Sequence, residues 1–275
     1  MSKQAIQVVA HRGMGQGFVQ KGAPPENTLP AFMEGWKIAR ACELDVHLTK
    51  DGQVIVIHDD TTNRTTNASW TVRDRFAAEL RSLDAGRWKA QKWAGTRLPL
   101  LDDVLDVMPD GCELFIELKD GPQVVPPAAE LVRQSGKASS VVLISFDVDT
   151  IMTAKEELPE NDCLLIVVFE ADYGNGRWNV LYDEGPGFRT VTKALVVDDL
   201  VALVKQYDLN GIDASFALPP SLITRLNDEK LRSVVWTVNE PSIALDMVRL
   251  GVDTITSDVP GPIRDALIAA GYAVR

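Results

Sequence analysis

The chain has 275 residues, of which 45% are hydrophobic, and its formal net charge at pH 7 is −11. This length and apolar content suffice for one α/β barrel, a fold of roughly 250 residues. The negative charge argues against nucleic acid as a partner and against electrostatic attachment to anionic membranes. An anionic substrate would therefore need a local positive site formed by Lys, Arg or a metal ion.

The cysteines and the N-terminal residues indicate an intracellular protein. Cys42, Cys112 and Cys163 are widely spaced and lie in or beside apolar strand patterns, so we expect buried, reduced thiols rather than a disulfide or a zinc site. Residues 2–4 lead directly into the first predicted strand, without the features of a signal peptide, and no stretch is long and apolar enough to span a membrane. The cytoplasm is the expected location, without stable membrane insertion.

Strand and helix patterns alternate along the whole chain. After the first strand, apolar residues at 29, 32, 33 and 36 mark one face of a helix, with Asn27 or Thr28 as its cap. The strands are near-continuous apolar runs, as in a parallel sheet covered on both faces. They are predicted at 6–10, 42–48, 112–118, 141–145, 163–169, 211–215, 233–238 and 253–256. We therefore predict a (β/α)₈ TIM barrel that spans residues 1–275 as a single domain.

Two segments interrupt this alternation. Residues 61–99 contain Trp70, Trp88 and Trp93 and are predicted to form a small insertion after the second strand, over the barrel mouth. Residues 171–190 are predicted to be irregular, and they combine glycine with aromatic side chains, which is typical of a mobile loop that closes on a ligand. Surface elaboration with self-packed aromatic side chains is the alternative for both.

Three carboxylates are expected to converge at the carboxyl ends of the strands. Alternation along 42–48 places Glu43 and Asp45 on one face, and alternation along 112–119 places Glu117 on a face that points inward as well. Such groups cannot be buried together without a compensating charge. Since the ligands on offer are oxygens, a hard divalent cation such as Mg²⁺ or Ca²⁺ is expected, with Mn²⁺ as a further candidate. Pairing with nearby Arg or Lys is the alternative.

Two histidines follow apolar strands near this cluster. His11 and Arg12 come directly after the first strand, and His58 follows the extended run 54–57. Two imidazoles beside a metal suit a general acid and a general base that act on opposite sides of one displacement. Arg12 and Lys119 are candidates to hold phosphate oxygens.

The third histidine is expected to lie outside this chemistry. His47 shares the face of Asp45, but it lies beyond the carboxylates and beside 49–52, which has the composition of a turn. We therefore predict that His47 is a solvated turn residue and that its replacement by alanine has little effect.

The order of several motifs resembles that of the glycerophosphodiester phosphodiesterases over nearly the whole chain. These motifs are His11-Arg12-Gly13, Pro25-Glu26-Asn27-Thr28, Glu43-Leu44-Asp45-Val46, Leu48-Thr49-Lys50-Asp51-Gly52, His58-Asp59, Pro99-Leu100-Leu101-Asp102-Asp103-Val104-Leu105, Ile116-Glu117-Leu118-Lys119, Ser145-Phe146, Trp236-Thr237-Val238-Asn239 and Gly251-Val252-Asp253-Thr254-Ile255-Thr256-Ser257-Asp258-Val259-Pro260.

The resemblance implies a fold, a reaction and a set of site residues. The fold is a (β/α)₈ barrel with a small insertion after the second strand, and the reaction is metal-assisted hydrolysis of a small-molecule glycerophosphodiester to glycerol 3-phosphate and an alcohol. The implied roles are acid/base catalysis by His11 and His58, metal binding by Glu43, Asp45 and Glu117, phosphate contacts by Arg12 and Lys119, support of the first loop by Glu26 and Asn27, and lining of the pocket by Trp236.

One departure from the family pattern keeps the alcohol open. Residues 14–24, eleven in number, separate Gly13 from Pro25, which is longer than usual for the family. The same site acting on a lysophospholipid, a sphingolipid or a sugar-phosphodiester such as an opine is the nearest alternative, and a non-catalytic binding barrel is a more distant one. Attack by the substrate's own glycerol 2-hydroxyl and attack by water both stay open, as does the choice of acid and base.

Overall fold

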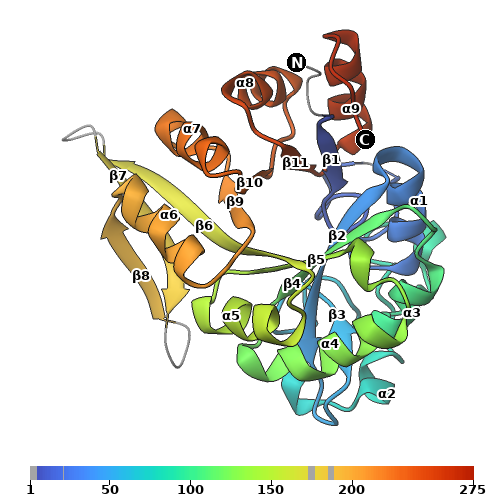
Figure 1. Cartoon of the computed structure of the whole chain (residues 1–275). Helices are drawn as coiled ribbons and strands as arrows, with labels where there is room; N and C mark the ends of the chain where they lie inside the picture. Colours follow the sequence, from blue (N-terminus) through green and yellow to red (C-terminus); the bar gives the residue numbers. More distant parts are fainter. Residues whose placement is uncertain (1–4, 21, 173–176, 185–188) are drawn as a thin grey trace.

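The computed structural model describes residues 5–20, 22–172, 177–184 and 189–275 (Figure 1). Among these residues, eight parallel strands pair side by side and the last pairs with the first, which closes the sheet into a barrel. The predicted (β/α)₈ fold is confirmed. In order around the barrel, the strands are β1 (Gln7–Ala10), β2 (Ala41–Leu48), β4 (Glu113–Leu118), β5 (Val141–Ser145), β6 (Asp162–Asp172), β9 (Gly211–Ser215), β10 (Arg232–Trp236) and β11 (Thr254–Ser257).

Helices between the strands cover the outside of the barrel (Figure 1). The first of them has Pro30 in its first turn, where the fixed φ of proline favours helix initiation. Thr28 occupies the cap position, but its hydroxyl donates to the carbonyl oxygen of Pro25 at 2.6 Å instead of capping the helix. The covering helices are α1 (Leu29–Ala39), α3 (Leu101–Val107), α4 (Val125–Gln134), α5 (Val148–Glu157), α6 (Val197–Gln206), α7 (Pro220–Asp228), α8 (Pro241–Leu250) and α9 (Pro260–Ala269).

Alternation along the strands separates two apolar layers. Side chains such as Leu44 on β2 and Ile116 on β4 belong to the large core between the sheet and the helices. The opposite strand faces fill the barrel interior with a smaller cluster. Its buried members are Val9, Ala41, Phe115, Val142, Ile144, Leu164, Ile166 and Val234. This packed interior is the base beneath the polar residues at the carboxyl ends of β1, β2 and β4.

The insertion predicted at 61–99 forms a separate apolar cluster together with β3 and the residues that flank it. It follows β3 (Val54–Val56), which pairs antiparallel with β2. The segment contains the short helix α2 (Ala77–Leu80) and the 3₁₀ turns η1 (Val72–Asp74) and η2 (Gln91–Trp93). Its buried cluster consists of Ile55, Ile57, Val72, Ala77, Leu80, Leu83, Ala85, Leu98 and Leu100.

The prediction of an irregular segment at 171–190 is wrong for the residues described there. β6 continues to Asp172 and pairs antiparallel with β7 (Arg177–Glu184), which pairs with β8 (Arg189–Ala194). Val180 and Tyr182 are buried against the main core, whereas Leu181 between them is only partly buried, and this period of two in burial is typical of a strand. The glycines at 174, 176, 185 and 187, on which the loop prediction depended, lie outside the described residues.

The three cysteines are free and buried, as the sequence predicts. Burial raises the pKa of the Cys163 thiol to about 12, so this group stays protonated near neutral pH. Among the described residues, no helix is long and apolar enough to cross a membrane.

Candidate active site

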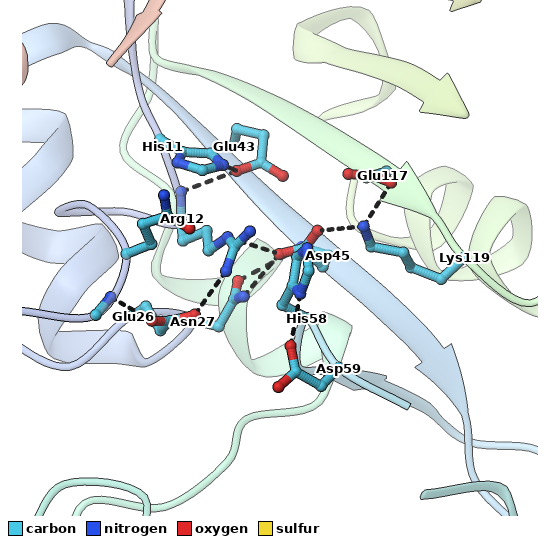
Figure 2. A network of polar contacts seen from close by, with 12 residues as sticks. His11, Arg12, Glu26, Asn27, Glu43, Asp45, His58, Asp59, Glu117 and Lys119 are labelled. Carbon is cyan, nitrogen blue, oxygen red and sulfur yellow. Dashed lines mark hydrogen bonds and ion pairs between the residues drawn. The ribbon is translucent and has the colours of Figure 1, made fainter. Parts of the chain in front are cut away.

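Three buried carboxylates face one another at the mouth of the barrel (Figure 2). Glu43, Asp45 and Glu117 each offer one oxygen, and these oxygens lie within 4.8 Å of one another. The register of the sheet explains this proximity, because Asp45 on β2 pairs with Glu117 on β4. The structure therefore brings together the carboxylates that the sequence predicts to converge.

Two cations compensate part of this negative charge. Lys119 Nζ lies 2.5 Å from Glu117 Oε1 and 3.1 Å from Asp45 Oδ1, and Arg12 Nε lies 3.5 Å from Asp45 Oδ2. Against the effect of burial, Lys119 and Arg12 hold the pKa of Asp45 well below its usual range. Burial, together with the charges of Asp45 and Glu117, raises the pKa of Glu43 well above its usual range. Compensation is therefore incomplete on the Glu43 side of the cluster.

The donor set of the cluster fits a hard divalent cation. All three candidate ligands are carboxylates, which Mg²⁺ and Ca²⁺ prefer, whereas zinc sites are rich in Cys and His. Burial and the neighbouring carboxylates raise the pKa of Glu43 and the pKa of Glu117. A divalent charge would relieve the repulsion among these carboxylates. The residues present therefore fit a metal ion.

His11 is oriented by a carboxylate from the far end of the chain. Its Nδ1 lies 2.7 Å from Asp258 Oδ1, so Nε2 remains for the cavity, 3.9 Å from Glu43 Oε2. Asp258, completely buried, also accepts hydrogen bonds from the Gln16 backbone at 2.9 Å and from Asn239 Nδ2 at 2.8 Å. Against the effect of burial, the bond to His11 lowers the pKa of Asp258, which stays ionised and fixes the imidazole orientation.

His58 has an equivalent arrangement on the other side of the cluster. Its Nδ1 lies 2.7 Å from Asp59 Oδ1, and Arg64 donates to both oxygens of Asp59 at 2.7 and 2.9 Å. These bonds outweigh burial and lower the pKa of Asp59 to about 2. The pKa of His58 itself is lowered, first by burial and also by Lys119 and Arg12, which outweigh the charge of Asp45. The neutral form of His58 is therefore favoured.

Glu26 and Asn27 connect these groups to the first loop. Glu26 accepts hydrogen bonds from Arg12 at 2.8 Å, from Arg64 at 2.8 and 2.9 Å, and from the Gly17 backbone at 2.6 Å. Asn27 Nδ2 donates to Asp45 Oδ2 at 2.8 Å. Arg12 and Asn27 have φ values of 50° and 55°, a conformation that non-glycine residues rarely adopt and that is concentrated at functional sites.

A cavity of about 200 Å³ joins these groups to an apolar wall. Trp236 stands in this wall, where its Nε1 donates to the carbonyl oxygen of Asp213 at 3.4 Å and its ring meets Phe146 edge-to-face at 5.8 Å. The lining residues are His11, Arg12, Gln16, Glu43, His58, Glu117, Lys119, Ile144, Phe146, Ile166, Asp213, Trp236, Thr237 and Thr256.

Comparisons with known proteins agree with this geometry. The model of the glycerophosphoryl diester phosphodiesterase family matches residues 11–262. The chain belongs to this family. The matched region begins at His11 and includes every residue of the cluster, and the family generally depends on divalent metal ions.

Individual relatives cover nearly the whole chain. The Bacillus subtilis protein YhdW is 32% identical over 257 residues, which cover 92% of this chain and 94% of YhdW. A glycerophosphodiester phosphodiesterase of Caldanaerobacter subterraneus subsp. tengcongensis is 30% identical over 260 residues, with the same two coverages. The fold is similar to that of an Oleispira antarctica phosphodiesterase solved with the product sn-glycerol-3-phosphate, with a TM-score of 0.76, 24% identity and coverages of 95% and 96%.

The prediction that His47 is a solvated turn residue is wrong. His47 belongs to β2 and is 5% exposed. Its Nδ1 lies 2.7 Å from Asp120 Oδ1, and its Nε2 lies 3.0 Å from the carbonyl oxygen of His58. β2 extends to Leu48 because β3 pairs with its end, and this pairing carries His47 into the buried strand. His47 therefore supports the backbone that carries His58.

Sequence reasoning assigned no role to Asp258 or Arg64, although both orient a histidine. Asp258 directly follows β11 and is two residues beyond Thr256, which lines the cavity, so alternation along that strand would have placed it at the mouth. No comparable signal exists for Arg64, because its position depends on how the insertion folds back.

We expect His47→Ala to lower both stability and turnover. The change removes one hydrogen-bond donor from the Asp120 carboxylate, which keeps its bond from the Leu48 backbone, and one from the carbonyl oxygen of His58. These losses cost about 1–3 kcal/mol in the free energy of unfolding and release the backbone at His58. Urea unfolding and turnover measurements check this. His47→Gln is the matched control and should lose less, because it retains a donor. Unchanged values for His47→Ala would show that these contacts do not support His58.

Proposed function

We propose that this protein hydrolyses glycerophosphodiesters to glycerol 3-phosphate and an alcohol. The observation that carries the proposal is the pairing of each cavity histidine with a carboxylate, His11 with Asp258 and His58 with Asp59, at 2.7 Å in both cases. The two histidines flank the carboxylate cluster, His11 near Glu43 and His58 near Asp45. Family membership and the named activity of the Caldanaerobacter relative support the same reaction.

Glu43, Asp45 and Glu117 are proposed to hold one divalent cation, Mg²⁺ or Ca²⁺, with Mn²⁺ as a further candidate. When bound, the ion supplies positive charge and Lewis acidity to the phosphoryl group. The chain's own cations complete the phosphate site. Arg12 Nε is buried without a hydrogen-bond partner, and the Lys119 ammonium lines the cavity, so both can donate to phosphate oxygens.

The two histidines are proposed to move the protons of the reaction. Because Nδ1 of each ring is held by a carboxylate, Nε2 is the atom that exchanges a proton with the substrate. One imidazole accepts a proton from the attacking hydroxyl, and the other donates a proton to the leaving alkoxide. Trp236 and Phe146 exclude water from the opposite wall.

A lysophospholipid is the alternative substrate that a specific observation favours. Phe18 and Val19 are 68% and 48% exposed and line a depression that shares Arg12 and His58 with the catalytic cavity. Exposed apolar side chains beside the cavity suit an acyl chain. A lysophospholipid carries this chain on its glycerol, so this alternative substrate would turn its glycerol toward Phe18. Sphingolipids and sugar-phosphodiesters remain alternatives of the same chemistry. A non-catalytic barrel is disfavoured, because both histidines and all three carboxylates are present.

Three further expectations from the sequence stay predictions. They are a cytoplasmic location, the absence of a nucleic-acid partner, which follows from the net charge of −11, and a single domain over 1–275.

Metal removal should abolish activity. We expect EDTA treatment to stop hydrolysis of glycerophosphocholine and Mg²⁺, Ca²⁺ or Mn²⁺ to restore it, and we expect metal to raise the melting temperature by binding only the folded state. Glu117→Gln should weaken metal binding measured by calorimetry, whereas Glu34→Gln, on the exposed side of α1, should not. Full activity of a rigorously metal-free preparation would contradict the proposed site.

Each cavity histidine should be essential for turnover. His11→Ala and His58→Ala are each expected to lower kcat by roughly 10²–10⁴, the range for loss of general acid or base catalysis. Metal affinity and the thermal unfolding midpoint serve as controls and should change little. A variant that keeps wild-type turnover would remove that histidine from the mechanism.

The exposed side chains of the first loop should influence the choice of substrate. Phe18→Ala is expected to lower kcat/KM for lysophosphatidylcholine relative to glycerophosphocholine by about fivefold, the equivalent of about 1 kcal/mol. Phe76→Ala is the matched control, since Phe76 is 47% exposed and lines neither the cavity nor the depression. Choline, ethanolamine and inositol diesters complete the panel. Equal losses on every substrate would mark the loop as a general lid.

A further inference from the structure

Asp213 is a buried carboxyl group that the mechanism above does not use. It lies on β9, is 3% exposed and lines the catalytic cavity. Its Oδ1 has no hydrogen-bond partner. Among the described residues, four other side chains have a buried polar atom without a hydrogen-bond partner. Arg12 and Asp45 belong to the catalytic cluster, and Trp93 and Thr254 do not line the cavity. Asp213 is therefore an unsatisfied group in the substrate's space.

The position of β9 places Asp213 across the cavity from the carboxylate cluster. In the closed barrel, β9 is the fourth strand from β2 in either direction, and β2 carries Glu43 and Asp45. A substrate whose phosphate lies at the cluster would extend its other atoms toward Asp213.

The cation that attracts Asp213 is engaged with other residues. Arg232, on the neighbouring strand β10, attracts it, but the Arg232 guanidinium is bound to Asp162 Oδ2 at 2.8 Å and to the side chain of Gln7. Burial, and then the charge of Glu117, raise the pKa of Asp213 well above its usual range. In its protonated form, which burial favours, the side chain can donate one hydrogen bond as well as accept.

The walls around Asp213 are apolar. Ile144, Ile166, Phe146 and Trp236 line the same cavity, and the indole of Trp236 donates to the backbone oxygen of Asp213. A small number of polar groups in a mostly apolar wall is the arrangement by which ligand sites fix the orientation of a small molecule. An unsatisfied buried carboxyl is costly in the free protein, and a ligand hydroxyl that bonds to it removes this cost.

We propose that Asp213 forms a hydrogen bond with a hydroxyl of the substrate's glycerol moiety. This bond distinguishes glycerophosphodiesters from phosphodiesters that lack the hydroxyl. Glycerol, rather than the leaving alcohol, is assigned to this end because Asp213 is enclosed. A larger alcohol needs the open side, where Phe18 and Val19 are exposed. The inference rests on the proposed function, because it takes the glycerol phosphate unit as the bound group.

Binding of product analogues tests this assignment without turnover. We would measure the affinities of sn-glycerol 3-phosphate and of propyl phosphate, which lacks both hydroxyls, for the metal-loaded wild type, for Asp213→Leu and for Asp213→Asn. The wild type should prefer sn-glycerol 3-phosphate. Asp213→Leu should reduce the ratio of the two affinities by about 10-fold or more, as expected for loss of a hydrogen bond to a buried group. Asp213→Asn, which keeps a donor and an acceptor, should retain most of the preference.

Other outcomes would overturn the assignment. An unchanged ratio in Asp213→Leu, or equal weakening of both ligands, would show that Asp213 does not contact the glycerol hydroxyls. Thermal unfolding verifies the fold, and Asp213→Ala replaces the leucine variant if that variant does not fold. If the wild type discriminates between the two ligands as expected but hydrolyses no diester, the proposed reaction fails while the Asp213 assignment stands.

Discussion

The burial of three carboxylates within 4.8 Å of one another is the constraint on which the rest of the site depends. Like charges at such distances in a low-dielectric environment repel strongly, so the fold has to supply positive charge and directed hydrogen bonds around them. Arg12, Lys119 and Asn27 do this for Asp45, and the Arg12 backbone does so for Glu43 at 2.8 Å. The remaining repulsion makes the cluster receptive to a cation.

The cavity has two unlike walls because the barrel strands divide into two groups. β1, β2 and β4 contribute the charged residues, whereas β5, β6 and β10 contribute Ile144, Phe146, Ile166 and Trp236. A phosphodiester has a charged phosphate and largely neutral substituents, so its two parts match the two walls. Asp213 is the ionisable exception in the second wall, which is why it has a bearing on substrate choice.

Local periodicity was sufficient to predict the barrel and the inward carboxylates. In a strand, side chains alternate with a period of two, so the face shared by Glu43 and Asp45 follows from their spacing alone. A different pattern predicted the eight barrel strands, since each is a short, near-continuous apolar run bounded by turn residues. Neither pattern predicts the strand in 171–190, because Leu181 is apolar as well; only the structure shows that Val180 and Tyr182 are buried on β7.

The sequence by itself determined the eight barrel strands, their inward faces and the residues that end them, because these depend on neighbours a few positions apart. Only the tertiary structure decided which of those residues meet. Asp258 orients His11 across 247 positions because the barrel closes by pairing β1 with β11, and His47 is buried because β3 pairs with the end of β2. Such contacts depend on which strands become neighbours in space, and spacing along the chain does not carry that information.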